Sequence, residues 1–110
     1  MKGQPPGPAP VDPIIHAPAR LTIMATLAAV READFRYLLH VTQLTKGNLS
    51  AHLRKLEEAG YVEIEKTFRG KYPLTICRLT EKGRKAFETY RRHMLAFLER
   101  AQTTPSEGQA

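Results

Sequence analysis

Few combinations of side chains in the sequence could catalyse a reaction. Ser50 and His52 could serve as a nucleophile and its base, but they lie two residues apart in a segment predicted to be helical. Side chains at that spacing point about 200° away from each other around a helix, so they cannot form a dyad. The sequence also shows no glycine-rich phosphate loop and no carboxylate pair suited to a cleft. We therefore predict no catalytic residue, no cofactor and no enzymatic activity.

Metal binding is not favoured either. The four histidines show no metal-ligand spacing such as i and i+4; they are His16, His40, His52 and His93. The single cysteine, Cys77, excludes an intrachain disulfide and a cysteine-rich metal cage. It falls in a predicted strand, where a small buried hydrophobe is the favoured interpretation. A redox-reactive thiol would need partial exposure and a cationic neighbour such as Arg78, and it stays open as an alternative.

One segment combines cationic, small and hydrogen-bonding side chains at helical spacing. Leu49, Leu53 and Leu56 form an inner apolar stripe, and the opposite face carries short or cationic side chains: Lys46, Gly47, Asn48, Ser50, Ala51, Arg54 and Lys55. Such a face can enter a DNA major groove, where Asn and Ser bond to base edges and cations neutralise phosphates. His52 lies between the two faces and could donate to a phosphate. A solvated surface helix is the alternative, and this segment alone favours neither interpretation.

A basic hairpin follows this helix and favours the DNA-binding interpretation. Val62 and Ile64 alternate as in a strand, the run LTICRL is rich in β-forming residues, and FRGKYP connects them as a turn. Arg69 and Lys71 flank the glycine at the predicted tip, from which they could reach the minor groove or the backbone. The alternative is a plain turn that its charges keep soluble.

The remaining elements give the order helix, helix, helix, hairpin, helix. The residues predicted to begin a helix are Pro18 for the first, Asp34 for the second, Thr45 for the third and Thr80 for the last. The second helix is expected to end near Thr42, and the third at Gly60. The predicted fold class is mainly α with a small β-hairpin, a winged helix-turn-helix with a long C-terminal helix.

Composition sets the domain boundaries and excludes several classes of protein. Residues 1–15 are rich in proline and glycine and are expected to be a flexible arm, and residues 102–110 a disordered tail, so residues 16–101 form the domain. The 110-residue chain has 17 Lys and Arg against 11 Asp and Glu, a net charge of +6. Such a charge suits an anionic partner. The longest uncharged apolar stretch, Leu21 to Val30, is shorter than the about 20 residues that a membrane helix needs. We expect a cytoplasmic protein without membrane association.

The last predicted helix is longer than so small a core can cover. It has roughly 20 residues and so a length of about 30 Å. Its apolar face consists of Phe87, Tyr90, Met94, Phe97, Leu98 and Ala101. We expect Phe87 and Tyr90 to pack within the monomer, and Met94, Phe97 and Leu98 to form a two-fold dimer interface.

Two runs, LTKGNLSAHLRKLEEAGYVEIEK and RLTEKGRKAF, with the basic turn between them, resemble the small stand-alone winged-helix regulators related to the ArsR and MarR families. The resemblance covers roughly His16 to Leu98. It implies a homodimer on a pseudo-palindromic operator, with DNA contacts from Thr45, Lys46, Asn48, Ser50, His52, Arg54, Arg69 and Lys71. Ala17 departs from the serine or threonine that relatives often have before the first-helix proline. The paired cysteines of metal-sensing ArsR members are lacking.

These observations predict a homodimeric transcriptional regulator, a repressor, that binds double-stranded DNA sequence-specifically. The alternative is a winged-helix adaptor that binds other proteins without specific DNA binding, because a fold alone does not determine function. No residue pattern identifies a small-molecule effector.

Overall fold

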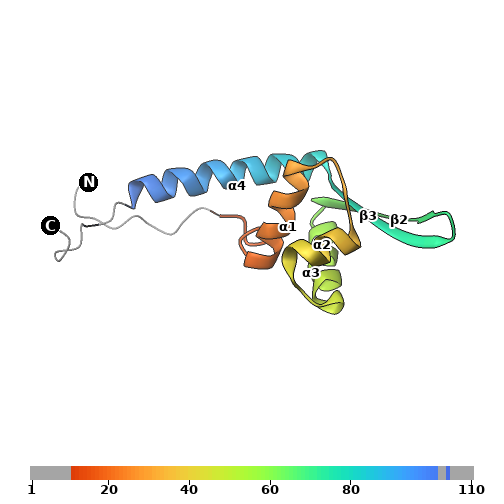
Figure 1. The fold of residues 1–110 in the computed structure, drawn as a ribbon. Coiled ribbons are helices and arrows are strands. Elements are labelled where there is room, and N and C mark those ends of the chain that lie inside the picture. The colour runs from red at the N-terminus through yellow and green to blue at the C-terminus, as the bar shows by residue number, and fades with distance from the viewer. Residues whose placement is uncertain (1–10, 102–103, 105–110) are drawn as a thin grey trace.

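The structure, a computed structural model, describes residues 11–101 and residue 104 of the chain. Its elements follow one another as α1 (Pro18–Ala29), β1 (Ala33–Asp34), α2 (Phe35–Thr42), α3 (Lys46–Glu58), β2 (Val62–Arg69), β3 (Tyr72–Leu79) and α4 (Glu81–Arg100) (Figure 1). This is a winged helix fold with a long C-terminal helix, as predicted. The short strand β1 was not predicted.

The helix starts follow from the capping residues. Three side-chain oxygens accept a backbone N–H of the first turn: Asp34 from Tyr37 at 2.8 Å, Thr45 from Asn48 at 3.1 Å and Thr80 from Gly83 at 2.9 Å. Each cap of this kind typically contributes about 1 kcal/mol. Helix α1 begins at Pro18, and Ala17 before it provides no side-chain cap, as expected from the sequence.

The sheet is antiparallel, with the strand order β1-β3-β2. Strand β1 adds two residues to the hairpin, with Ala33 opposite Cys77 and Asp34 opposite Ile76. Two residues are too few to show the alternation that predicts a strand. The outer part of the hairpin extends away from the helices as the wing (Figure 1).

The core lies where α1, α2 and α3 meet the base of the sheet. Its fully buried side chains include Ile23, Met24 and Leu27 of α1, Leu38 of α2 and Leu49 and Leu56 of α3. Leu53 is buried as well, so the predicted inner stripe of the third helix is confirmed. Helix α1 lies between α4 on one side and α3 on the other (Figure 1). No helix in the described part of the chain is long and apolar enough to cross a membrane.

The segment before α1 belongs to the folded domain. Ile15 is fully buried in the core, and Asp12 accepts hydrogen bonds from the backbone N–H of Ile14 and from the hydroxyl of Tyr61. Burial and the bond to Asp12 raise the pKa of Tyr61 to about 12. The prediction of a flexible arm is therefore wrong for residues 11–15, because an isoleucine and a bonding carboxylate offset the proline content. Residues 1–10 and all of the predicted tail except residue 104 lie outside the described residues.

A close backbone contact fixes the start of α4 against the turn that joins α3 to β2. Gly83 lies so near Tyr61 that a Cβ on it would be 2.1 Å from the Tyr61 carbonyl oxygen. Thr80 makes two hydrogen bonds to the same turn. Its backbone N–H donates to the carbonyl of Tyr61 at 3.0 Å, and its hydroxyl donates to the carbonyl of Gly60 at 2.5 Å. Gly60 has a φ of +81°, a conformation that favours glycine. Gly60, which was predicted to end the third helix, and Gly83, which was not singled out in the sequence, are thus both required by geometry.

Candidate nucleic-acid interface

Helix α3 presents a polar face to solvent. The buried leucine stripe holds one side of the helix on the core, and the exposed residues on the remaining surface include Lys46, Gly47, Asn48, Ser50, Ala51, Arg54 and Lys55. A Cβ on Gly47 would meet nothing within 4 Å, so the start of the helix is open to close approach. The structure therefore brings the predicted recognition-helix residues onto one accessible element.

Thr45 was expected both to cap the third helix and to contact DNA, and the structure shows the cap. Its hydroxyl oxygen accepts the N–H of Asn48 and thereby caps α3. The residue is exposed, so the hydroxyl proton can still be donated outward. Thr45 orients the first turn, from which Lys46 and Asn48 project.

His52 lies partly buried between α3 and α1. Its Nδ1 is 3.3 Å from Nη1 of Arg20. A guanidinium only donates hydrogen bonds, so Nδ1 accepts and the ring proton is on Nε2. Burial lowers the pKa of His52, and the positive charges of Arg20 and Lys55 lower it further. His52 is therefore held neutral, and what it can offer a phosphate is a neutral N–H rather than a positive charge.

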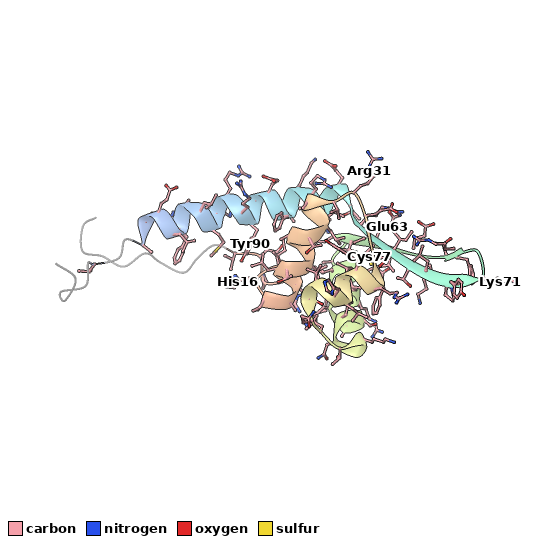
Figure 2. All side chains as sticks on the ribbon, in the orientation of Figure 1. His16, Arg31, Glu63, Lys71, Cys77 and Tyr90 are labelled. Carbon is pink, nitrogen blue, oxygen red and sulfur yellow. The ribbon has the colours of Figure 1, made fainter. Side chains whose placement is uncertain are left out.

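The wing places its cations far from the core. Arg69 and Lys71 are exposed on either side of Gly70, whose φ of +62° makes the tight turn. Figure 2 shows Lys71 at the tip of the wing. All ion pairs between described residues involve Arg78 near the base of the hairpin, which contacts Glu32 at 3.2 Å, Glu63 at 3.5 Å and Glu65 at 3.0 Å. The carboxylates of Glu65 and Glu32 raise the pKa of Arg78. Arg78 thus offsets part of the negative charge at the base of the wing, and the tip cations remain exposed to solvent.

Sequence reasoning missed two groups of residues on this surface. Phe68 and Tyr72 are exposed beside the tip, and Tyr37 is 47% exposed on α2. The signal for the first two was present, because FRGKYP places an aromatic residue on each side of the cationic turn. The contact of Arg20 with His52 had no signal, since the two residues lie 32 positions apart.

The end of α4 carries an apolar surface that the monomer leaves partly exposed. Met94 and Phe97 are half-buried, Leu98 is 58% exposed and Leu95, which was not predicted, is 47% exposed. Tyr90 is buried, and its hydroxyl lies 2.9 Å from Nδ1 of His16. Tyr90 therefore packs within the monomer as expected. The last turns of α4 extend beyond the other helices (Figure 1).

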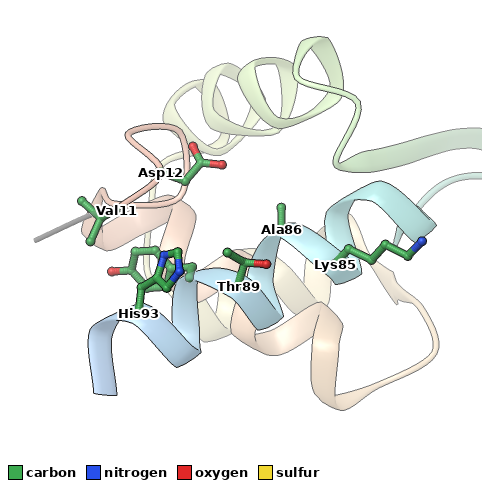
Figure 3. Close-up of a pocket in the computed structure, with 7 residues that line it drawn as sticks. Val11, Asp12, Lys85, Ala86, Thr89 and His93 are labelled. Carbon is green, nitrogen blue, oxygen red and sulfur yellow. The ribbon is translucent and has the colours of Figure 1, made fainter. Parts of the chain in front are cut away.

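A pocket of about 480 Å³ opens between the N-terminal segment and α4 (Figure 3). The residues that line it are Val11, Asp12, Lys85, Ala86, Thr89, Tyr90 and His93. None of them belongs to α3 or to the wing, so the pocket is separate from the candidate DNA-binding surface. Among the residues that the structure describes, no group of three or more His, Cys, Asp or Glu side chains is arranged to hold a metal ion.

Cys77 is fully buried in β3. Burial raises the pKa of its thiol to about 11, and the nearby Asp34 and Glu57 carboxylates act in the same direction. A thiol with this pKa contains almost no thiolate at neutral pH, although thiolate is the reactive form. The interpretation of Cys77 as a small buried hydrophobe is confirmed.

The four helices, the sheet and the exposed helix beside a cationic wing define a winged helix protein of the DNA-binding class. The chain belongs to the winged helix DNA-binding domain family, whose model matches residues 19–98. This family consists of DNA-binding proteins rather than enzymes.

Individual relatives agree with this assignment. The chain is 42% identical over 77 residues to the uncharacterized protein MJ0432 of Methanocaldococcus jannaschii, a match that covers 70% of this chain and 84% of that protein. A transcriptional regulator homologue from Pyrococcus horikoshii has a similar structure, with a TM-score of 0.77 and 31% identity over 82% of this chain and 89% of that one. A MarR family regulator from Silicibacter pomeroyi shares the fold, with a TM-score of 0.61 and 24% identity over 87% of this chain and 65% of that one. The chain is a winged helix transcriptional regulator.

Proposed function

We propose that this regulator is a homodimeric repressor that binds a pseudo-palindromic operator in double-stranded DNA. The observation that carries the proposal is the exposed polar and cationic face of α3 beside a wing whose tip is cationic. Lys46, Arg54 and Lys71 take part in none of the ion pairs between described residues, so their charges are available to phosphates.

Helix α3 is proposed to enter the major groove. Asn48 and Ser50 are exposed near its start, and their side chains can donate to and accept from base edges. Lys46, Arg54 and Lys55 can neutralise phosphates or reach guanine. The neutral His52 can donate its Nε2–H to a phosphate, and Thr45 keeps the first turn of the helix in place. Arg69 and Lys71 are proposed to hold the adjacent minor groove or backbone.

Dimerisation is proposed to occur through α4. Leu95 and Leu98 are exposed on its last turns, next to the half-buried Met94 and Phe97. A two-fold interface formed by these side chains covers the apolar surface of both copies. The symmetry then places two α3 helices in successive major grooves, about 34 Å apart. A dimer bound in this way represses by occluding a promoter.

The experiment that tests the proposal is a fluorescence-anisotropy titration against fragments of the upstream region of its own gene, with a scrambled duplex as the control. We expect saturable binding that favours the native fragment and weakens steeply with salt. If about five phosphates are neutralised per dimer, the log-log slope should be about −4 to −5. Lys46→Ala should weaken binding, whereas the matched variant Lys85→Ala, which removes a lysine from α4, should not. Absence of binding to either duplex at low salt would contradict the proposal and favour a protein-interaction adaptor.

A further inference from the structure

The tip of the wing carries two large aromatic side chains that the fold leaves in solvent. Phe68 is 68% exposed and Tyr72 is 79% exposed, the highest values among the exposed large hydrophobic residues of the described chain. They flank the cationic turn of Arg69, Gly70 and Lys71. A tight turn needs glycine but no aromatic neighbour. Large aromatic side chains are disfavoured on the surface of a soluble protein unless they serve a function. We therefore expect Phe68 and Tyr72 to contact a binding partner.

The strand register places the two rings on opposite faces of the hairpin. Phe68 is opposite Pro73, and Arg69 is opposite Tyr72. Because successive residues of a strand point to alternate faces, one face carries Phe68 with Pro73 and the other carries Tyr72 with Arg69. The tip thus has an apolar group on both faces, which suits a partner that surrounds it.

The face that carries Phe68 is continuous with the core face of the sheet. Val62 and Ile64 lie on the same face at even spacing from Phe68, and they pack into the core against which α3 lies. Phe68 therefore extends the wing surface on the side of the sheet that packs against the helices. A partner that contacts α3 can reach Phe68 as well.

The charge of the outer hairpin identifies the partner as anionic. Residues 66–77 contain three cations, Lys66, Arg69 and Lys71, and no acidic residue. Glu63 and Glu65 lie closer to the base, where Arg78 contacts them at 3.5 and 3.0 Å and offsets part of their charge. A thin ribbon with a cationic tip and apolar faces is complementary to the minor groove of duplex DNA, which is anionic at its rims and can be opened by an apolar wedge.

We propose that Phe68, supported by Pro73, is an apolar wedge that enters the minor groove beside Arg69 and Lys71 and partly unstacks one base step. Tyr72 packs on the groove wall on the opposite face of the ribbon. Wedges of this kind kink the duplex toward the major groove, which here brings more DNA toward α3. This inference rests on the proposed operator binding and adds a deformation of the DNA to it.

The test uses the full chain and operator duplexes in which 2-aminopurine replaces single adenines across the wing-contact region. Fluorescence of this base rises when it unstacks, and anisotropy of the same samples reports affinity. We expect the wild-type protein to raise the fluorescence at one step in each half-site. Phe68→Ala should abolish that rise and weaken binding by about tenfold, because a large apolar surface is no longer buried. Phe68→Leu, which keeps an apolar wedge, should restore most of both signals.

A charge control separates the wedge from electrostatic binding. Lys71→Ala removes two lysines from the dimer and should reduce the magnitude of the salt slope by about 2, whereas Phe68→Ala should leave the slope unchanged. Wild-type binding that produces no unstacking, or unstacking that survives in Phe68→Ala, would overturn the wedge while leaving operator binding intact. Failure of the wild type to bind any duplex would refute the proposed function itself. A change of oligomeric state in Phe68→Ala, with unchanged DNA binding, would assign the ring to self-association and overturn the wedge.

Discussion

Arg20 on α1 lies 3.3 Å from His52 on α3, measured from Nη1 to Nδ1. The same guanidinium donates through Nε to the carbonyl of Ile14 at 2.6 Å. One side chain therefore connects the N-terminal segment, the first helix and the proposed recognition helix. Burial and this contact lower the pKa of His52, and the contact orients its ring on α3.

The stability of the protein should depend on pH through His52. Its folded-state pKa lies below the ordinary value of 6.5 because of burial and the positive charge of Arg20. When the pH falls through 6.5, the unfolded chain takes up this proton before the folded chain does, so the free energy of unfolding decreases. We expect urea unfolding to show a smaller loss of stability between pH 8 and pH 5.5 in His52→Gln than in the wild type. The matched variant His40→Gln, at an exposed site on α2, should behave like the wild type, and an equal loss in all three proteins would contradict the role of His52.

Asn48 and Lys71 should affect DNA binding in different ways. Asn48 is placed to read a base edge, so Asn48→Ala should reduce discrimination between operator and scrambled DNA. Lys71 can contact only backbone or groove rims, so Lys71→Ala should weaken binding to both duplexes about equally. Anisotropy titrations of both variants on both duplexes measure this difference. If Asn48→Ala still discriminated between operator and scrambled DNA as the wild type does, Asn48 would not be a base-reading residue.

The dimer interface should be disrupted by a charge at Leu98 but not by one at Ala96. Both residues are exposed on the last turns of α4, but they lie about 200° apart around the helix. Only Leu98 belongs to the apolar face, so Leu98→Glu should yield monomers and Ala96→Glu should leave the dimer intact. Sedimentation velocity measures the oligomeric state. A wild type that sediments as a monomer at micromolar concentration would exclude this interface.

Gly83 should tolerate no side chain, whereas Gly47 should accept one. A Cβ at position 83 would be 2.1 Å from the Tyr61 carbonyl oxygen, and the backbone there must shift to avoid it. We expect Gly83→Ala to lower the free energy of unfolding by about 3 kcal/mol or more. Gly47→Ala adds a methyl group in open space within a helix and should raise stability by up to about 1 kcal/mol. Thermal and urea unfolding compare the two, and equal stabilities would show that the contact between Gly83 and the Tyr61 backbone is looser than described.

Cys77 should be unreactive in the native protein. Its buried thiol has a pKa of about 11, so reaction with a disulfide reagent at pH 8 should be slow until denaturant exposes the residue. Treatment with diamide should leave operator binding unchanged. Rapid modification of the native protein together with loss of DNA binding would instead make Cys77 a redox sensor.

Much of the fold could be predicted because its signals are local. Asp34, Thr45 and Thr80 each cap a helix through a backbone N–H three residues later, so the helix starts are encoded within one turn of sequence. The leucine stripe of α3 likewise follows from helical spacing alone. Strand β1 and the burial of Ile15 could not be predicted in this way, because both depend on partners distant in the sequence: Cys77 for the strand and the assembled core for the isoleucine.

The sequence by itself determined the order of elements, the caps, the basic charge and the set of polar residues on the third helix. These properties depend on residue type and on spacing within a few positions, so they can be predicted from helix and strand propensity and from the periodicity of apolar residues. Only the tertiary structure decided that His52 turns toward Arg20, that Arg78 pairs with the carboxylates at the base of the wing, and that Phe68 and Tyr72 remain exposed at its tip. These relationships join residues that chain folding brings together, and the free energy that selects them comes from packing and charge contacts between separate elements.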